Sequence, residues 1–376
     1  MVDIEISKLL EFSDRFPRPK WNKIAKLIET YPQSDRRDLW QSVCVSWLAE
    51  LGNVLGKAYQ LHESDHFVLL TRQQQKNSKL LLKTLEGART WMFGNLEGIV
   101  SDDAHWKNVV LIFHSPDDYY NYISSYYPDA GEFTLSAGVF LEDGYKHFAF
   151  LQDEIDRAEV VAVHEYSHAC LSHLPLPAWV NEGMAVAIEA EIIGLHHMRF
   201  DSEAMERHRS LWNEATIQDF WSGASFHKQE ENHLSYDLGY LCVRVLAQEY
   251  TAFRGFVLEA DARDGGEAAA RKHYSAGLGS LMSQILGEGD WSPKPDQWDR
   301  DRKNSSPPVP AESGITLRRP PGTRFLKKAG PLRQKLQTGW RWSERRGKNE
   351  PRVDVTPCFD LLLSSQISAG PFGVKR

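Results

Sequence analysis

The sequence lacks any long apolar stretch: its 376 residues contain no run of about 18 apolar residues, the length that a membrane-spanning helix requires. Its first residues, MVDIEISKLLEFSDRF, mix charged with apolar side chains and hold no apolar core of a secretory signal. Cysteine is scarce, and the four cysteines at 44, 170, 242 and 358 form no CxxC pair. We therefore expect buried free thiols, a cytoplasmic location and no membrane partner.

Basic side chains are also scarce outside the end of the chain. Residues 292–376 hold 18 Lys and Arg against 8 Asp and Glu, so residues 1–291 hold 26 against 43. Because nucleic-acid binding needs clustered Lys and Arg on a folded surface, the acidic body argues against a nucleic-acid partner. The hydrophobic content of 41% and the charged content of 25% are ordinary for a globular protein.

The last part of the chain has no hydrophobic period of 2 or 3.6. Prolines are scattered through it among basic residues, including those at 293, 295, 307, 308, 310, 320, 321 and 331. A segment of this composition buries too little apolar surface to fold. We therefore expect residues 292–376 to be a basic, Pro-rich tail, disordered from 296 onward, that adds nothing to the core.

Ahead of the tail, hydrophobic periodicity predicts an α+β fold. Residues 1–62 are assigned to an N-terminal helical region, because apolar residues around Trp40 and Trp47 are dense enough to form a core face. Residues 63–291 are assigned to one domain, in which a small mixed or antiparallel sheet packs on a zinc-binding helix and a helical subdomain follows. Strands are predicted at 66–71, 108–114, 136–141 and 147–151. Helices are predicted over most of 20–62, over 79–95, from Asp153 or Asp156 to Pro175, and over 177–193, 235–250 and parts of 253–286.

Residues 164–168 read His-Glu-Tyr-Ser-His within a predicted helix. Positions i and i+4 share one helical face with Cβ atoms roughly 5–6 Å apart. The imidazoles of His164 and His168 can therefore both reach one metal ion at about 2.0–2.1 Å. Glu165 is offset by one residue, so it flanks the ion, where a general base that takes a proton from water must stand. A catalytic zinc ion has three protein ligands, and we expect the third on a neighbouring element.

A second predicted helix follows after one turn bounded by Pro175 and Pro177. It contains Pro-Ala-Trp-Val-Asn-Glu-Gly-Met-Ala, and Glu182 falls where an antiparallel helix would face the first. Glu189 and Glu191, farther along this helix, are the alternative ligands.

Together, HEYSHACL and LPAWVNEGMAVAIE resemble the peptidase MA-like gluzincins, relatives of the thermolysin-type metallopeptidases. In that family HExxH is followed by a tryptophan and then by Glu-Gly-hydrophobic-Ala. The resemblance extends over residues 105–291 and includes VVLIFHSPDDYYNY, SAGVFLEDGYKHFAF and YDLGYLCVRVLAQEY. It implies a peptidase with one zinc ion held by His164, His168 and Glu182, and with Glu165 as the general base.

Two features of the sequence depart from these relatives. Thermolysin-like enzymes often carry an acid one turn after the third ligand, which orients a zinc-bound histidine, whereas this chain has Val186. Asn181 and Glu189 are the candidates for that role. The sequence also lacks the Gly-Ala-Met-Glu-Asn motif that binds a free amino terminus in aminopeptidases, which favours an endopeptidase.

Peptide hydrolysis also needs a hydrogen-bond donor for the oxyanion of the tetrahedral intermediate. The predicted helix after the site offers His233, Tyr236 and Tyr240, and the resemblance places Tyr-x-x-x-Tyr on that helix. We expect Tyr236 to be the donor, with ordinary packing as the alternative for either tyrosine. The expected substrate is a peptide or protein, lying along an edge strand at 136–141 or 147–151.

The same residues also suit a protein of another class, a zinc-stabilised scaffold that acts by binding a partner. A water-accessible coordination position favours the enzyme, and a buried one favours the scaffold. Hydrolysis of an amide in a small molecule is a third alternative.

Overall fold

The computed structural model describes residues 6–298 apart from 14, 103, 125, 127–137, 143, 152–154, 195–200 and 229–230. The predicted disorder of the tail therefore concerns residues that lie almost entirely outside the described part of the chain. Within that part, no helix combines the length and the apolar character needed to span a membrane. The cysteines at 44, 170 and 242 are buried free thiols, as predicted.

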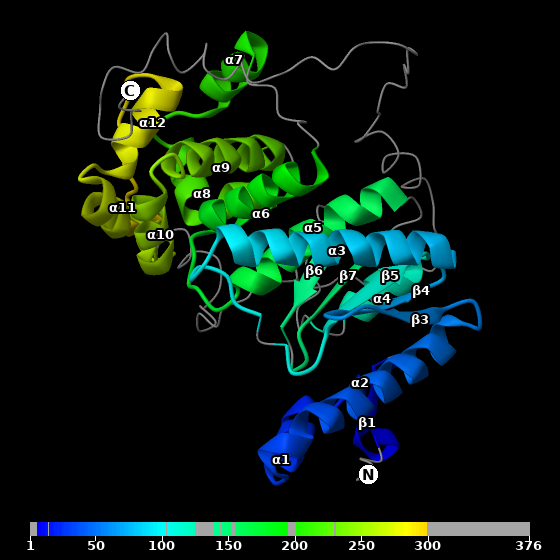
Figure 1. Cartoon of the computed structure of the whole chain (residues 1–376). Coiled ribbons are helices and arrows are strands. Elements are labelled where there is room, and N and C mark those ends of the chain that lie inside the picture. Colours follow the sequence, from blue (N-terminus) through cyan, green and yellow to red (C-terminus); the bar gives the residue numbers. More distant parts are fainter. Residues whose placement is uncertain are drawn as a thin grey trace.

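The fold is α+β, with a five-stranded mixed sheet, a separate two-stranded sheet and a set of helices (Figure 1). The strands are β1 (Leu10–Ser13), β2 (Phe16–Pro19), β3 (Gln60–Glu63), β4 (Phe67–Thr71), β5 (Asn108–Phe113), β6 (Gly138–Leu141) and β7 (His147–Leu151). The helices are η1 (Ile6–Leu9), α1 (Trp21–Glu29), α2 (Gln33–Leu55), α3 (Gln75–Asn95), α4 (Pro116–Ser124), α5 (Ile155–Leu171), α6 (Ala178–Ile193), α7 (Ser202–Leu211), α8 (Thr216–Ser222), η3 (Ala224–His227), α9 (Asn232–Leu246), α10 (Tyr250–Glu259), α11 (Glu267–Tyr274) and α12 (Leu278–Leu286).

The larger sheet has the strand order β3-β4-β5-β7-β6. Its three inner strands are parallel, whereas β3 and β6 run antiparallel to their neighbours and form the two edges. The four predicted strands are confirmed, except that residues 136–137 lie outside the described part. The sheet is mixed, and its edge near α5 is β6, because β7 is paired on both sides.

Residues 20–62 are mostly helical, as predicted, but the N-terminal region ends in a strand, β3, that was not predicted. Helix α2 ends at Gly56, whose φ of 115° suits glycine and few other residues. The chain then forms the β3–β4 hairpin. The sequence of β3, Gln-Leu-His-Glu, carries too few apolar residues to identify a strand without its partner. The β1–β2 hairpin was not predicted either.

Side chains of the inner strands enter two different cores. On β4, Phe67 and Leu69 join one core, and Val68 and Leu70 join the other, because successive residues of a strand point to opposite faces. Residues of α3 and α5 complete the first core, and residues of α1, α2 and α4 complete the second (Figure 1). The N-terminal helices therefore share a hydrophobic core with the sheet, and α5 is fixed against the opposite face.

Helices α6 and α9 approach each other closely at two glycines. A methyl group on Gly183 would collide with the carbonyl oxygen of Gly239, and one on Gly239 would lie 2.9 Å from the carbonyl oxygen of Trp179. The absence of both side chains therefore sets the distance between the helix that carries Glu182 and the helix that carries Tyr236.

We expect Gly183→Ala to destabilise the fold, because the added methyl group meets backbone that cannot rotate away. Overpacking of this kind costs about 1–3 kcal/mol, and each kcal/mol lowers the melting temperature of a chain this long by roughly 2–4 °C. Gly87→Ala on α3 is the matched control, since nothing lies within 4 Å of its added methyl group and alanine favours a helix. Thermal unfolding measured by circular dichroism should show a lower melting temperature for Gly183→Ala only.

The packed part of the chain continues beyond the boundary predicted at residue 291. Trp298 is buried, and its indole nitrogen donates a hydrogen bond to Gln218 Oε1 at 3.1 Å. The Gln218 amide also bonds the backbone of Ser292 and Lys294, at 2.9 and 2.8 Å. Residues 292–298 thus join the core beside α8, although they contain prolines and charged residues like the tail that follows them.

We expect a chain ending at Trp298 to keep the melting temperature of the full chain. A chain ending at Trp291 should melt lower, because it loses the buried indole of Trp298 and its bonds to Gln218. Loss of a buried tryptophan costs on the order of 3–5 kcal/mol. Thermal unfolding of the three chains tests this. A drop of more than about 5 °C for the chain ending at Trp298 would mean that later residues also pack on the core.

Candidate metal centre

Helix α5 presents the two histidines of the His-Glu-Tyr-Ser-His segment on a different side from its buried face. Ala162, Val163 and Tyr166 are fully buried in the core that α5 shares with the sheet and α3. The 3.6-residue period then turns His164 and His168 toward α6.

Helix α6 starts after Pro177 and is fixed at its first turn by Trp179. The Trp179 side chain is fully buried, and its indole nitrogen donates to the carbonyl oxygen of Gly265 at 2.9 Å. It also packs edge-on against Trp221. This tryptophan anchors α6 to the C-terminal helices, and Glu182 follows it by three residues on the side that faces α5.

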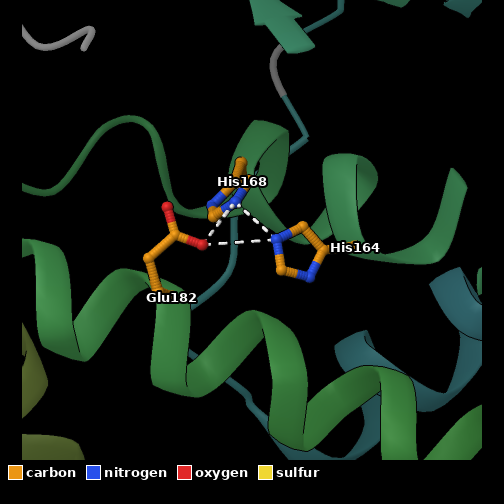
Figure 2. Close-up of side chains that lie close together, drawn as sticks. All are labelled: His164, His168 and Glu182. Carbon is orange, nitrogen blue, oxygen red and sulfur yellow. Dashed lines mark hydrogen bonds and ion pairs between the residues drawn. The ribbon is translucent and has the colours of Figure 1, made fainter. Parts of the chain in front are cut away.

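Three ligand atoms from α5 and α6 converge in one place (Figure 2). His164 Nε2 and His168 Nε2 lie 3.1 Å apart, and Glu182 Oε2 lies 3.3 Å from each of them. An ion bound tetrahedrally at about 2.0–2.1 Å holds its ligand atoms roughly 3.3–3.4 Å apart. The three atoms are therefore spaced as ligands of one ion, and these residues form a group that can hold a metal.

The hydrogen bonding of the two imidazoles directs both Nε2 lone pairs into this group. His168 Nδ1 lies 3.1 Å from Asn181 Oδ1, and His164 Nδ1 lies 3.4 Å from Glu189 Oε2. Because an oxygen acceptor beside Nδ1 favours a proton there, each neutral ring has its lone pair on Nε2. Two lone pairs and a carboxylate oxygen then face one another, an arrangement that requires a proton or a metal ion between them.

The electrostatics of the group favour positive charge at its centre. Burial would raise the pKa of Glu182, but the two histidines outweigh it and lower that pKa. Burial would lower the pKa of His164, but Glu182 and Glu189 outweigh it and hold that pKa well above its ordinary value. Glu182 Oε2 is buried and has no hydrogen-bond partner among the described residues. A buried oxygen without a donor is costly, and a cation beside it removes that cost.

Of the three acids considered as the third ligand, Glu182 is the one in this group. Glu189 contacts the other nitrogen of His164. Glu191 points elsewhere, and Arg244 donates to its carboxylate at 2.5 Å. Asn181 and Glu189 were both considered for orienting a histidine. Asn181 contacts His168, and Glu189 contacts His164.

Glu165 lies beside the group without joining it. Its side chain is 5% exposed, and the backbone N–H of Phe140 on β6 hydrogen bonds its carboxylate. A methyl group on Gly138 would lie 2.8 Å from Glu165 Oε1, so β6 has room for this carboxylate because residue 138 has no side chain. Burial raises the pKa of Glu165, although the histidines oppose it. A carboxylate with a raised pKa is suited to receive a proton.

Tyr236 on α9 lies against His164, His168 and Glu182, hereafter the metal group. Its ring centroid is 6.3 Å from that of His164, in an edge-on arrangement, and the ring of Phe226 also packs edge-on with it at 5.3 Å. Burial raises the pKa of Tyr236, and the carboxylates of Glu182 and Glu165 raise it further. The tyrosine is therefore held in its protonated form, in which it can donate a hydrogen bond.

The other two candidate donors on α9 have different neighbours. The charges of Arg244 and Glu191 act on the pKa of Tyr240, and the charge of Arg207 acts on the pKa of His233.

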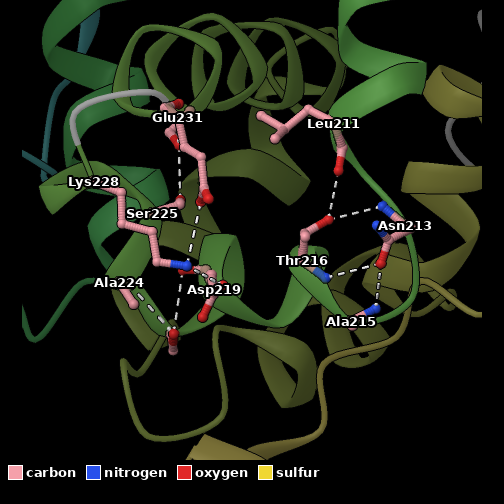
Figure 3. Close-up of polar contacts among 11 residues, drawn as sticks. Leu211, Asn213, Ala215, Thr216, Asp219, Ala224, Ser225, Lys228 and Glu231 are labelled. Carbon is pink, nitrogen blue, oxygen red and sulfur yellow. Dashed lines mark hydrogen bonds and ion pairs between the residues drawn. The ribbon is translucent and has the colours of Figure 1, made fainter.

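His227 is a residue near the site that the sequence analysis did not single out. Burial lowers its pKa, and the nearby Glu182 carboxylate raises it. Figure 3 shows how the adjoining segment is fixed: Lys228 Nζ lies 2.5 Å from Asp219 and 3.4 Å from Glu231. These ion pairs join α8 to the start of α9. No local signal marks His227, because only the packing of these helices brings it near Glu182.

The histidines of the metal group are partly exposed, whereas its carboxylate is buried. The side chains of His164 and His168 are 18% and 12% exposed, compared with 7% for Glu182. The ligand oxygen, Glu182 Oε2, is itself buried.

A comparison with protein-family models finds no match to the chain, and a comparison with curated proteins finds none either.

Proposed function

We propose that this protein is a zinc-dependent metallopeptidase of the gluzincin type, which hydrolyses peptide bonds in a peptide or protein. The observation that carries this proposal is the spacing of His164 Nε2, His168 Nε2 and Glu182 Oε2, at 3.1–3.3 Å. The described residues bring three ligands together, which supports an enzyme over a scaffold, since a structural zinc site is closed by four protein ligands.

The donor set supports zinc among the common cellular ions. Two imidazoles and one carboxylate suit zinc well, whereas calcium and magnesium prefer oxygen ligands throughout. His164, His168 and Glu182 would hold the ion. Bound there, zinc lowers the pKa of a coordinated water molecule and polarises a carbonyl oxygen.

The remaining chemistry falls to side chains of this chain. Glu165 acts as the general base: it accepts the proton of the attacking water and passes it to the leaving amine. Its burial and the Phe140 hydrogen bond hold the carboxylate in place. The protonated hydroxyl of Tyr236 donates a hydrogen bond to the oxyanion of the tetrahedral intermediate, and the contact of its ring with His164 supports this role.

Strand β6 supports a peptide as the substrate. It is an edge of the sheet, with β7 on one side, and Phe140 on this strand bonds the proposed base. An extended peptide can add to such an edge through main-chain hydrogen bonds, and its scissile bond would then lie near Glu165. We also place the protein in the cytoplasm, on the evidence of its buried free cysteines.

We expect purified protein that has not met a chelator to carry about one zinc ion per chain, since the described residues contain one three-ligand group of this kind. Inductively coupled plasma emission measures the stoichiometry directly. The same preparation should cleave members of a diverse peptide library, with loss of cleavage after treatment with a chelator. Stoichiometry near zero would refute the metal site. Zinc without cleavage of any peptide would favour the scaffold.

A further inference from the structure

The carboxylate of Glu189 has a position that the ligand set does not explain. It lies 3.4 Å from His164 Nδ1, on the side of the ring opposite the metal group. Its side chain is 15% exposed, so most of it is removed from water. A largely buried carboxylate that faces a single imidazole nitrogen is suited to hold that ring in one tautomer and one orientation.

The geometry of α6 explains why this residue can reach His164. Glu182, Val186 and Glu189 are separated by four and three residues, so they lie along one face of the helix. Glu182 contacts the Nε2 atoms of both histidines, and Glu189, two turns farther on, contacts the far side of His164. Val186 occupies the intermediate turn and offers no acceptor.

We propose that Glu189 is the positioning residue for His164: its carboxylate accepts a hydrogen bond from Nδ1–H and so directs the Nε2 lone pair at the metal site. This inference rests on the proposed zinc site. Asn181 does the same for His168 with a neutral oxygen, at 3.1 Å. The two zinc-binding histidines are thus held differently, one by a carboxylate and one by an amide. A carboxylate partner increases the basicity of its histidine, so His164 is the stronger of the two ligands.

The test is the zinc affinity of Glu189→Ala, measured by competition with a chromogenic chelator. Loss of such an outer partner typically weakens metal binding about 10–100-fold, and we expect a loss in that range. Glu191→Ala is the matched control: it removes an acid from the same helix, two residues away, that pairs with Arg244 rather than a histidine. Its zinc affinity should stay within about threefold of that of the unaltered protein.

A rescue variant tests the geometry. Val186→Asp combined with Glu189→Ala returns a carboxylate to the same helical face, one turn nearer Glu182. The double variant should bind zinc at least tenfold more tightly than Glu189→Ala alone. Cobalt substitution gives a second readout, because the visible absorption of bound cobalt reports the ligand geometry. That spectrum should change in Glu189→Ala and remain unchanged in Glu191→Ala. If Glu189→Ala fails to fold by circular dichroism, Glu189→Gln provides the comparison, since it removes the charge and keeps the shape.

Each outcome bears on a separate claim. If the unaltered protein binds zinc and Glu189→Ala binds it equally well, the inference about Glu189 is refuted while the zinc site stands. An equal loss in Glu189→Ala and Glu191→Ala also refutes it, because general electrostatics then accounts for both. If the unaltered protein binds no zinc, the proposed function itself fails.

Discussion

Replacement of Glu165 by glutamine should leave the bound zinc in place and reduce peptide cleavage by about 10²–10⁴-fold, the typical contribution of a general base. Glutamine keeps the shape of the side chain, so it still fits beside Gly138, where the space is too small for a methyl group. It removes the basic oxygen that receives the proton of the attacking water. The affinity for zinc should be preserved, because Glu165 is not one of the three ligand residues.

The measurement pairs two readouts on one preparation: zinc content by plasma emission, and cleavage of a peptide that the unaltered protein is known to cut. Glu159→Gln is the matched control, since Glu159 lies on the same helix and accepts a hydrogen bond from Thr84 at 2.7 Å, away from the metal group. This control should keep both zinc and activity. Full activity in Glu165→Gln would contradict the mechanism proposed for this site.

The sequence predicted the candidate site well where the relevant contacts are local. A four-residue spacing within a helix fixes the relation of His164 to His168, whatever the rest of the fold does. The position of Glu182 relative to these histidines depends on the short turn between α5 and α6. A short connection allows two helices few relative positions. The resemblance to gluzincins added the expectation of which acid on that helix faces the metal.

Contacts that depend on distant parts of the chain could not be predicted. Asn181 and Glu189 were both candidates for one role, and only the packing of α5 on α6 assigns a different histidine to each. Gly138 looked like an ordinary strand residue, because its closeness to Glu165 arises when β6 packs on α5. Trp298 was assigned to the tail from composition, yet it fills a space beside Gln218, 80 residues earlier in the chain.

Replacement of Glu182 by alanine should have the opposite signature to Glu165→Gln: zinc should be lost, and activity should fall in proportion to occupancy. Two imidazoles remain, so the variant keeps part of the site and binds zinc weakly. The loss of affinity should exceed the roughly 10–100-fold expected for removal of an outer-shell partner, because a direct ligand disappears. Excess zinc should therefore restore part of the activity of Glu182→Ala and none of that of Glu165→Gln.

Dialysis against metal-free buffer, followed by plasma emission and then by titration with added zinc, separates these outcomes. The fold should survive the substitution, because α6 is anchored by the buried Trp179 and its hydrogen bond to Gly265. Removal of this buried carboxylate also takes away one of the groups that raise the pKa of both histidines, which favours their neutral forms. If Glu182→Ala instead holds its zinc through dialysis while Glu189→Ala releases it, then Glu189 is the third ligand, and α6 must turn relative to α5 when the ion binds.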